Sequence, residues 1–223
     1  MSKIKIIIVA CAMQEEYRQA YKAIVGRDYE GNFGEEFEFV GDKGFSFNLI
    51  GVGKVQAAMN LTRVLTLMKE RNYYNVTHVV NVGFAAGTKD MFLGQVLTVH
   101  KVFQYDLRLP SEFSEELKHN QVQDAWMPFA SAFNSYCASG DSFVTKEDVE
   151  KLITLNPSIT CFDMESAAVV RVCQKFKVRP VVIKIISDIP QNEDKSGAKA
   201  FMEMYTSDNQ KYFNHLKEVI KLL

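Results

Sequence analysis

The fold is indicated by the stretch Ile4-Lys5-Ile6-Ile7-Ile8-Val9-Ala10-Cys11-Ala12-Met13-Gln14-Glu15-Glu16. Its first part is a β-branched run, which is typical of a strand covered on both faces, and a helical pattern begins after three small residues. Similar changes recur along the chain. Strands are predicted at 77–82, 95–103, 159–162 and 181–186, and helices at 55–68, 145–155, 165–176 and 196–223. Strands that alternate with helices predict an α/β layered fold with a largely parallel central sheet.

Other segments complete this prediction. The runs 37–40 and 45–50 flank Gly41-Asp42-Lys43-Gly44, which predicts an antiparallel hairpin. The segment 105–127 is polar and irregular, apart from a short helical pattern at 114–118. No linker, repeat or low-complexity segment divides the chain, so we expect one domain over residues 1–223.

The composition excludes several classes of protein. The chain has 223 residues, of which 47% are hydrophobic and 24% charged, and its net charge is −1. Without an excess of basic residues, a nucleic acid is not an expected partner. No apolar run is long enough to cross a membrane and no signal peptide is recognisable, so we expect a cytoplasmic protein. The four cysteines and four histidines are scattered, which predicts free thiols and no metal site.

Acidic residues follow several of the predicted strands. Glu16 lies beyond the first strand. Asp163 and Glu165 follow the 159–162 strand, and Asp188 follows the last strand. Because ligands bind beyond the carboxyl ends of parallel strands, we expect these carboxylates in one site. Taken singly, each has a structural explanation, since an acidic residue stabilises a helix N-terminus or caps a turn. A glycine-bearing turn predicted at 83–87 lacks the spacing of a phosphate-binding loop.

Six short motifs lie in order along nearly the whole chain. They are Ala12-Met13-Gln14-Glu15-Glu16, Gly51-Val52-Gly53-Lys54, Asn81-Val82-Gly83-Phe84-Ala85-Ala86-Gly87, Ser139-Gly140-Asp141-Ser142-Phe143-Val144, Phe162-Asp163-Met164-Glu165-Ser166-Ala167 and Ile186-Ser187-Asp188. Read together, they resemble the nucleoside phosphorylase/nucleosidase family, above all its 5′-methylthioadenosine/S-adenosylhomocysteine nucleosidases. The resemblance implies a three-layer α/β sandwich of the phosphorylase/hydrolase type. It also implies a cofactor-free homodimer that cleaves the N-glycosidic bond of adenine nucleosides.

The resemblance implies two catalytic residues. Glu16 would be the carboxylate that activates water, and Asp188, helped by Ser187, would protonate adenine at N7. Adenine leaves poorly as an anion, and the sugar has oxocarbenium character in the transition state. One carboxyl must therefore be protonated while another is ionised. Burial beside a like charge raises a carboxyl pKa and solvent keeps it low, and we expect the raised pKa at Asp188.

The resemblance also implies how substrate is held. Glu165 would bind the ribose hydroxyls and Met164 would pack on the sugar. Phe143 would stack on the purine, and the Val144 backbone would bond to the purine edge. The other residues expected at the site are Met13, Val52, Phe84, Ala85, Lys184 and Ser187. The implied substrates are 5′-methylthioadenosine and S-adenosylhomocysteine.

Several residues depart from the family pattern. Phe84 stands where the family usually has Ser or Thr, which removes a hydroxyl near the water and adds bulk to the pocket. Ala86 replaces a glycine, so the backbone approaches the sugar less freely. Lys184 and Asp163 replace Arg and Glu, as in the plant-type nucleosidases. Phe201 is a candidate for the aromatic residue that the family has soon after Asp188.

Two other functions compete with hydrolysis. A phosphorylase on the same fold would use phosphate in place of water and needs fixed cationic or backbone donors. Family phosphorylases usually carry an arginine where this chain has Asn81, and a carboxylate at Glu16 repels phosphate. A catalytically inactive adenine nucleoside-binding protein is suggested by Phe84, whereas the retained Glu165 and Asp188 favour an enzyme. We therefore expect a hydrolase.

Overall fold

The structure, a computed structural model, describes residues 3–33, 36–107, 122–127, 135–192 and 197–223. The helical pattern at 114–118 lies outside these ranges. Within them, nine strands form one sheet. The strands are β1 (Ile4–Cys11), β2 (Glu36–Val40), β3 (Lys43–Leu49), β4 (Tyr74–Gly87), β5 (Val96–Gln104), β6 (Val122–Asp124), β7 (Ser135–Ser139), β8 (Ile159–Asp163) and β9 (Arg179–Asp188).

Part of this sheet closes on itself. β1 pairs in parallel with β3 and β4, and β2 forms the predicted antiparallel hairpin with β3. β4 pairs with both β8 and β9. β9 pairs with β5, and β5 is connected through β7 to β8. β4, β9, β5, β7 and β8 therefore form a closed ring, and the sheet is mixed, as expected, with five parallel and four antiparallel strand pairings among the described residues.

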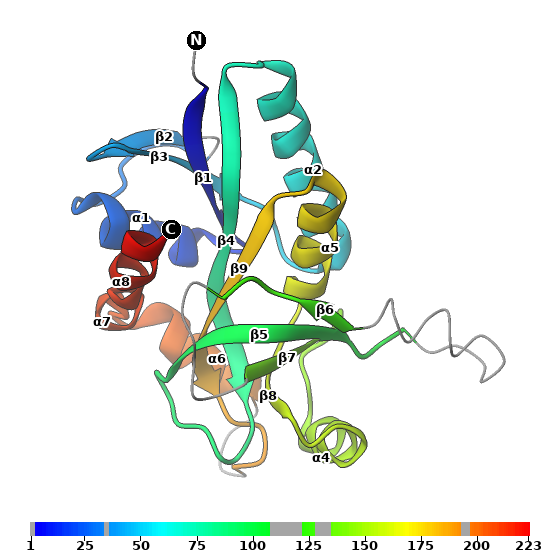
Figure 1. Ribbon diagram of the computed structural model, residues 1–223. Coiled ribbons are helices and arrows are strands. Elements are labelled where there is room, and N and C mark those ends of the chain that lie inside the picture. The colour runs from blue at the N-terminus through cyan, green and yellow to red at the C-terminus, as the bar shows by residue number, and fades with distance from the viewer. Residues whose placement is uncertain (1–2, 34–35, 108–121, 128–134, 193–196) are drawn as a thin grey trace, which may run out of the picture.

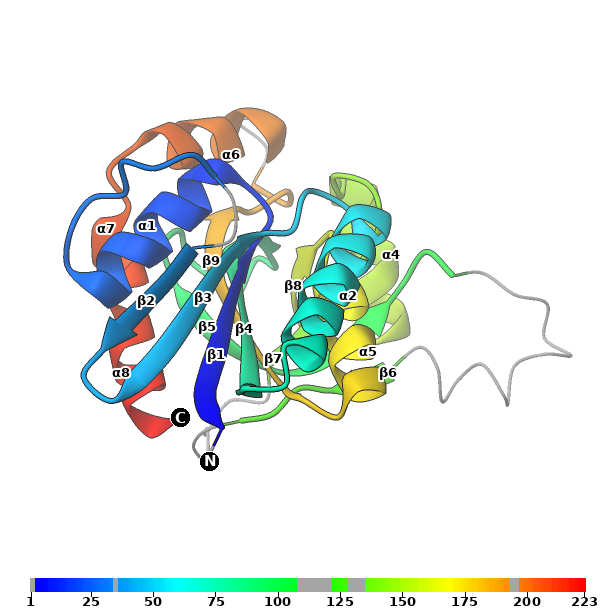
Figure 2. The same cartoon turned by 90° about the horizontal axis from the view of Figure 1, so that it is seen from above.

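Helices cover both faces of the sheet (Figures 1 and 2). One layer contains α1 (Gln14–Val25), α6 (Gly197–Thr206), α7 (Gln210–Phe213) and α8 (His215–Leu222). The opposite layer contains α2 (Lys54–Glu70) and α5 (Ser166–Phe176), with α4 (Lys146–Leu155) on the same side. The expected three-layer sandwich is confirmed. Among the helices in the described ranges, none has the length and apolar character that a bilayer crossing requires.

Two of the apolar clusters, one on each side of β1, show how the cores follow from the periodicity of the sequence. In α2, the helical spacing of Leu61, Leu65 and Met68 directs all three side chains into a buried cluster with Ile8 of β1 and Val169 of α5. The opposite core contains aromatic residues of α1 and β3. A strand between two such cores is apolar on both faces, which explains the continuous β-branched runs.

The turn predicted at 83–87 is wrong, because these residues belong to β4. Ala86 and Gly87 pair with Phe162 and Cys161 of β8, and the pairing of β4 with β9 shifts register after Ala85. Small residues let a strand bend where a barrel closes, so β4 crosses from β9 to β8 without ending. Residues 83–87 therefore belong to a strand of the closed ring and not to a loop beyond it.

Candidate active site

A pocket of about 370 Å³ opens where β4, β8 and β9 end. Glu16 and Asp188, the two residues expected to be catalytic, both line it. The other predicted residues in its lining are Met13, Val52, Phe84, Ala85, Phe143, Val144, Met164, Glu165 and Ser187. Lys184 is not in the lining. The structure thus brings all but one of the predicted site residues to one pocket.

Glu16 lies in the first turn of α1 and is 2% exposed. Its Oε2 accepts hydrogen bonds from the backbone N–H groups of Ala12 and Met13, both at 3.0 Å. Its Oε1 accepts one from the N–H of Phe84 at 2.8 Å. Gly83 leaves this space open, because a Cβ at Gly83 would lie 2.7 Å from Glu16 Cδ. These donors fix the orientation of the carboxylate and favour its ionised form.

The environment of Glu16 differs from the sequence-based expectation. Burial raises its pKa, while the charge of Lys184 and the backbone donors act to lower it. The expectation that solvent keeps the Glu16 carboxyl ionised is therefore wrong, because the side chain is buried. Fixed N–H groups take the place of water around the carboxylate.

Asp188 is the last residue of β9 and is 3% exposed. Its Oδ1 accepts a hydrogen bond from Ser187 Oγ at 2.7 Å. Burial raises the pKa of Asp188, and the Ser187 hydroxyl acts to lower it. The pKa of Asp188 is raised, as expected, and the cause is burial. A neighbouring like charge instead raises the pKa of Glu165.

Glu165 lies at the N-terminus of α5 and is 6% exposed. Its Oε1 accepts a hydrogen bond from the N–H of Gly53 at 2.8 Å. Burial and the nearby charge of Asp163 raise the pKa of Glu165 to about 7. This carboxyl therefore changes its charge near neutral pH.

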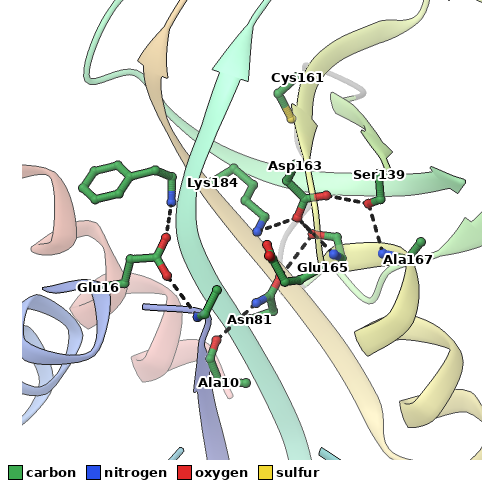
Figure 3. Close-up of polar contacts among 12 residues, drawn as sticks. Ala10, Glu16, Asn81, Ser139, Cys161, Asp163, Glu165, Ala167 and Lys184 are labelled. Atoms are coloured by element: carbon green, nitrogen blue, oxygen red, sulfur yellow. Dashed lines mark hydrogen bonds and ion pairs between the residues drawn. The ribbon is translucent and has the colours of Figure 1, made fainter. Parts of the chain in front are cut away.

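Asp163 and Lys184 form a buried ion pair beside these carboxyls (Figure 3). Lys184 Nζ lies 2.7 Å from Asp163 Oδ2, and both side chains are 1% exposed. The Ser139 and Ser166 hydroxyls also donate to Asp163. Although burial acts to raise the pKa of Asp163, Lys184 and the two hydroxyls lower it overall. The expected contact of Lys184 with substrate is corrected, because its ammonium is directed to Asp163 and influences the pocket through its charge.

The ring of Phe84 is accommodated by other aromatic side chains. It packs edge-on against Phe201, Tyr205 and Phe213, at ring-centroid distances of 6.1, 6.5 and 5.8 Å. Its backbone N–H still reaches Glu16. The replacement of a hydroxyl residue by phenylalanine therefore leaves the backbone donor to the carboxylate in place.

Phe143 and Phe201 form an aromatic wall of the pocket. Phe143 is 53% exposed, and its ring meets that of Phe201 edge-on at 5.5 Å. Phe201 comes from α6 and lines the pocket, as the sequence suggested for an aromatic residue in this region. A planar ligand on Phe143 would remove its apolar surface from water.

Sequence reasoning missed other lining residues. Ala198 and Met202 come from α6 and lie on the same face as Phe201. Ala198 lies three residues before Phe201 and four before Met202, and this helical spacing was the available signal. The described part of the lining contains no Arg, Lys or His. The described residues also hold no group of three or more His, Cys, Asp or Glu side chains suited to a metal.

Comparison with known proteins assigns the family. Residues 6–221 match the Phosphorylase superfamily, and the chain therefore belongs to this superfamily. A curated relative, the 5′-methylthioadenosine/S-adenosylhomocysteine nucleosidase of Shewanella denitrificans, is 28% identical over 210 residues. That alignment covers 85% of this chain and 88% of the relative. The resemblance inferred from the motifs is confirmed.

Solved structures share the fold. A mutant 5′-methylthioadenosine/S-adenosylhomocysteine nucleosidase of Helicobacter pylori, with 5′-methylthioadenosine in its active site, has a TM-score of 0.76 and 22% identity, with 100% of both chains covered. A futalosine hydrolase of the same organism has a TM-score of 0.73 and 20% identity, with 99% of both chains covered. Enzymes named for different nucleosides thus share this architecture.

Proposed function

We propose that this protein hydrolyses the N-glycosidic bond of 5′-methylthioadenosine, of S-adenosylhomocysteine or of both, and releases adenine. The observation that carries the proposal is that Glu16 and Asp188 line one pocket with different hydrogen-bond partners. Glu16 accepts backbone N–H groups and is suited to remain a carboxylate. Asp188 is buried beside one hydroxyl donor and is suited to hold a proton. Family membership and the curated relatives support this class of reaction.

In the proposed reaction, Glu16 takes a proton from a water molecule while the water oxygen bonds to the anomeric carbon. The bond between that carbon and adenine N9 breaks, and its electron pair goes to the base. Asp188 gives its proton to N7, so adenine leaves as a neutral molecule. The other product is the free 5′-substituted sugar, and exchange with solvent restores both carboxyls.

Other lining residues would hold the nucleoside. Ionised Glu165, oriented by Gly53, would accept hydrogen bonds from the ribose hydroxyls. Met164 would pack on the sugar and Phe143 on the purine face, while the Val144 backbone would bond to the purine edge. The assignment is supported because Glu165, Met164, Phe143 and Val144 all line the pocket.

A phosphorylase is the main competing function on this fold. Phosphate requires cationic or fixed backbone donors, and no described lining residue carries a positive charge. The Glu16 carboxylate would repel the phosphate anion. These two features favour water as the nucleophile.

Adenine release from nucleosides with different 5′ groups, with and without phosphate, tests the proposal. Turnover of 5′-methylthioadenosine in phosphate-free buffer is expected, and Glu16→Gln and Asp188→Asn should each lower the rate by at least about 10²-fold. Strict dependence on phosphate would instead establish a phosphorylase. Calorimetric binding of adenine without turnover of any adenine nucleoside would establish a binding protein. The panel should include futalosine, because a futalosine hydrolase shares this fold.

We further propose that the chain acts as one domain in a cytoplasmic homodimer and needs no cofactor. Val52, Val55 and Met59 support a subunit contact beside the pocket, because they are 47%, 74% and 56% exposed on the turn before α2 and on its first turns. Sedimentation velocity should give a dimer mass. Val55→Glu with Met59→Glu should give a monomer, and an unchanged dimer would exclude this surface.

A further inference from the structure

Three loops beside the pocket are joined by the side chain of Lys54. The turn 51–54 connects β3 to α2, Asp106 follows β5, and Asp141 lies between β7 and α4. Lys54 Nζ lies 2.5 Å from Asp106 Oδ2 and 2.9 Å from Asp141 Oδ2. These three residues are termed the Lys54 clamp.

Backbone hydrogen bonds reinforce the Lys54 clamp. The N–H of Lys54 donates to Asp141 Oδ1 at 2.8 Å, and the N–H of Asp141 donates to Asp106 Oδ2 at 3.0 Å. The Lys54 side chain is 13% exposed, although lysine usually extends into solvent. The Asp106 and Asp141 side chains are 31% and 46% exposed, so water partly screens the two ion pairs, and the backbone hydrogen bonds add to them. The Lys54 clamp therefore fixes the relative position of its loops.

The N–H donor to Glu165 and a segment that lines the pocket both adjoin the Lys54 clamp. Gly53, directly before Lys54, donates its N–H to Glu165 and has a φ of 85°, a conformation that favours glycine. A Cβ at Gly53 would lie 3.2 Å from Asp141 Oδ1, so the two loops are in close contact. Residues 142–144, directly after Asp141, line the pocket.

We propose that Lys54 is a positioning residue for substrate binding. It holds the N–H donor to Glu165 and the segment 142–144 at a fixed separation. The inference rests on the proposed function, in which Glu165 binds the ribose and this segment binds adenine. Glu16 receives its hydrogen bonds from Ala12, Met13 and Phe84, outside the Lys54 clamp. Loss of the Lys54 clamp should therefore weaken binding more than it slows the chemical step.

Steady-state adenine release by full-length Lys54→Met tests the inference. The expected result is an increase in KM of about tenfold or more, with kcat within about threefold of the wild-type value. The affinity for adenine, measured by calorimetry, should fall by a similar factor, because adenine contacts segment 142–144. Lys54→Arg should restore KM, since a guanidinium group can bond to two carboxylates.

Lys22→Met is the matched control. Lys22 Nζ pairs with Asp28 at 2.9 Å on the exposed side of α1, so this variant removes the same charge and one ion pair away from the pocket. Its KM should equal that of the wild type. If Lys54→Met does not fold, Asp106→Leu tests the same contact, because it removes the Oδ2 atom that accepts from both Lys54 and Asp141.

The outcomes separate this inference from the proposed function. An unchanged KM in Lys54→Met, with or without a lower melting temperature, overturns the positioning role. A lower kcat with an unchanged KM also overturns it, because the effect would then be on the chemical step. A wild-type protein that neither releases nor binds adenine overturns the proposed function itself.

Discussion

Replacing Gly83 with alanine should displace the Glu16 carboxylate. The new Cβ would lie 2.7 Å from Glu16 Cδ, whereas carbon atoms in contact normally stay about 3.5–4.0 Å apart. The carboxylate must therefore move by about 1 Å, and its hydrogen bonds to three backbone N–H groups would be distorted. A misplacement of about 1 Å can cost about 10²-fold in rate. We expect kcat/KM for adenine release to fall by about 10²-fold, or about 2.7 kcal/mol of transition-state stabilisation.

A double mutant shows whether the effect passes through Glu16. Glu16→Gln alone should lower kcat/KM by about 10²–10⁴-fold. Adding Gly83→Ala should lower it little further, because the carboxylate that the new Cβ displaces is already absent. Gly87→Ala is the control on the same strand, since its Cβ would crowd Ile186 and not Glu16. The fold-loss in kcat/KM caused by Gly87→Ala should multiply with that caused by Glu16→Gln, as expected for independent sites. The reasoning is refuted if Gly83→Ala keeps kcat/KM within about threefold, or if its effect also multiplies with that of Glu16→Gln.

Other predictions concern proton positions and stability. In its proposed role Glu165 accepts the ribose hydroxyls as a carboxylate, and burial and Asp163 raise its pKa to about 7, so kcat/KM should rise as pH increases through that value; a flat profile across neutral pH would contradict this. The Ser187 hydroxyl lowers the pKa of Asp188, so Ser187→Ala should raise it and move the alkaline decline of kcat to higher pH, whereas an unchanged decline would exclude that hydroxyl as the cause. Lys184→Met leaves Asp163 without its buried cation, and urea unfolding should show a loss of about 3–5 kcal/mol; a loss below about 1 kcal/mol would disprove this role.

Local sequence pattern predicted most of the layers. The β-branched run of β1 and the helical spacing of α2 each reflect burial that is visible in a few consecutive residues. The end of β4 was not predictable in this way. Glycine and alanine at 83–87 have the composition of a turn, and only pairing of Ala86 and Gly87 with a distant strand keeps them in the sheet.

The family resemblance supplied most of the site residues, whereas the four carboxylates Glu16, Asp163, Glu165 and Asp188 were predictable as a group because they follow strands whose carboxyl ends meet. Their hydrogen bonds were not. Glu16 receives a donor from Phe84, 68 residues further along the chain, and that donor is a backbone group with no side-chain signature. The direction of Lys184 depends on strand register, since neighbouring residues in a strand point to opposite faces. Sequence spacing alone does not fix the register of β9 against two partners.

The closed ring of five strands has a consequence for how such an enzyme diversifies. Phe84, Asp163 and Asp188 sit on β4, β8 and β9, each of which is bonded to two neighbouring ring strands. A backbone change that improved one of them would disturb the others. New substrate preferences should therefore evolve through α6 and the segment 142–144, which border the pocket from outside the ring and can vary while the residues on the ring strands stay in place.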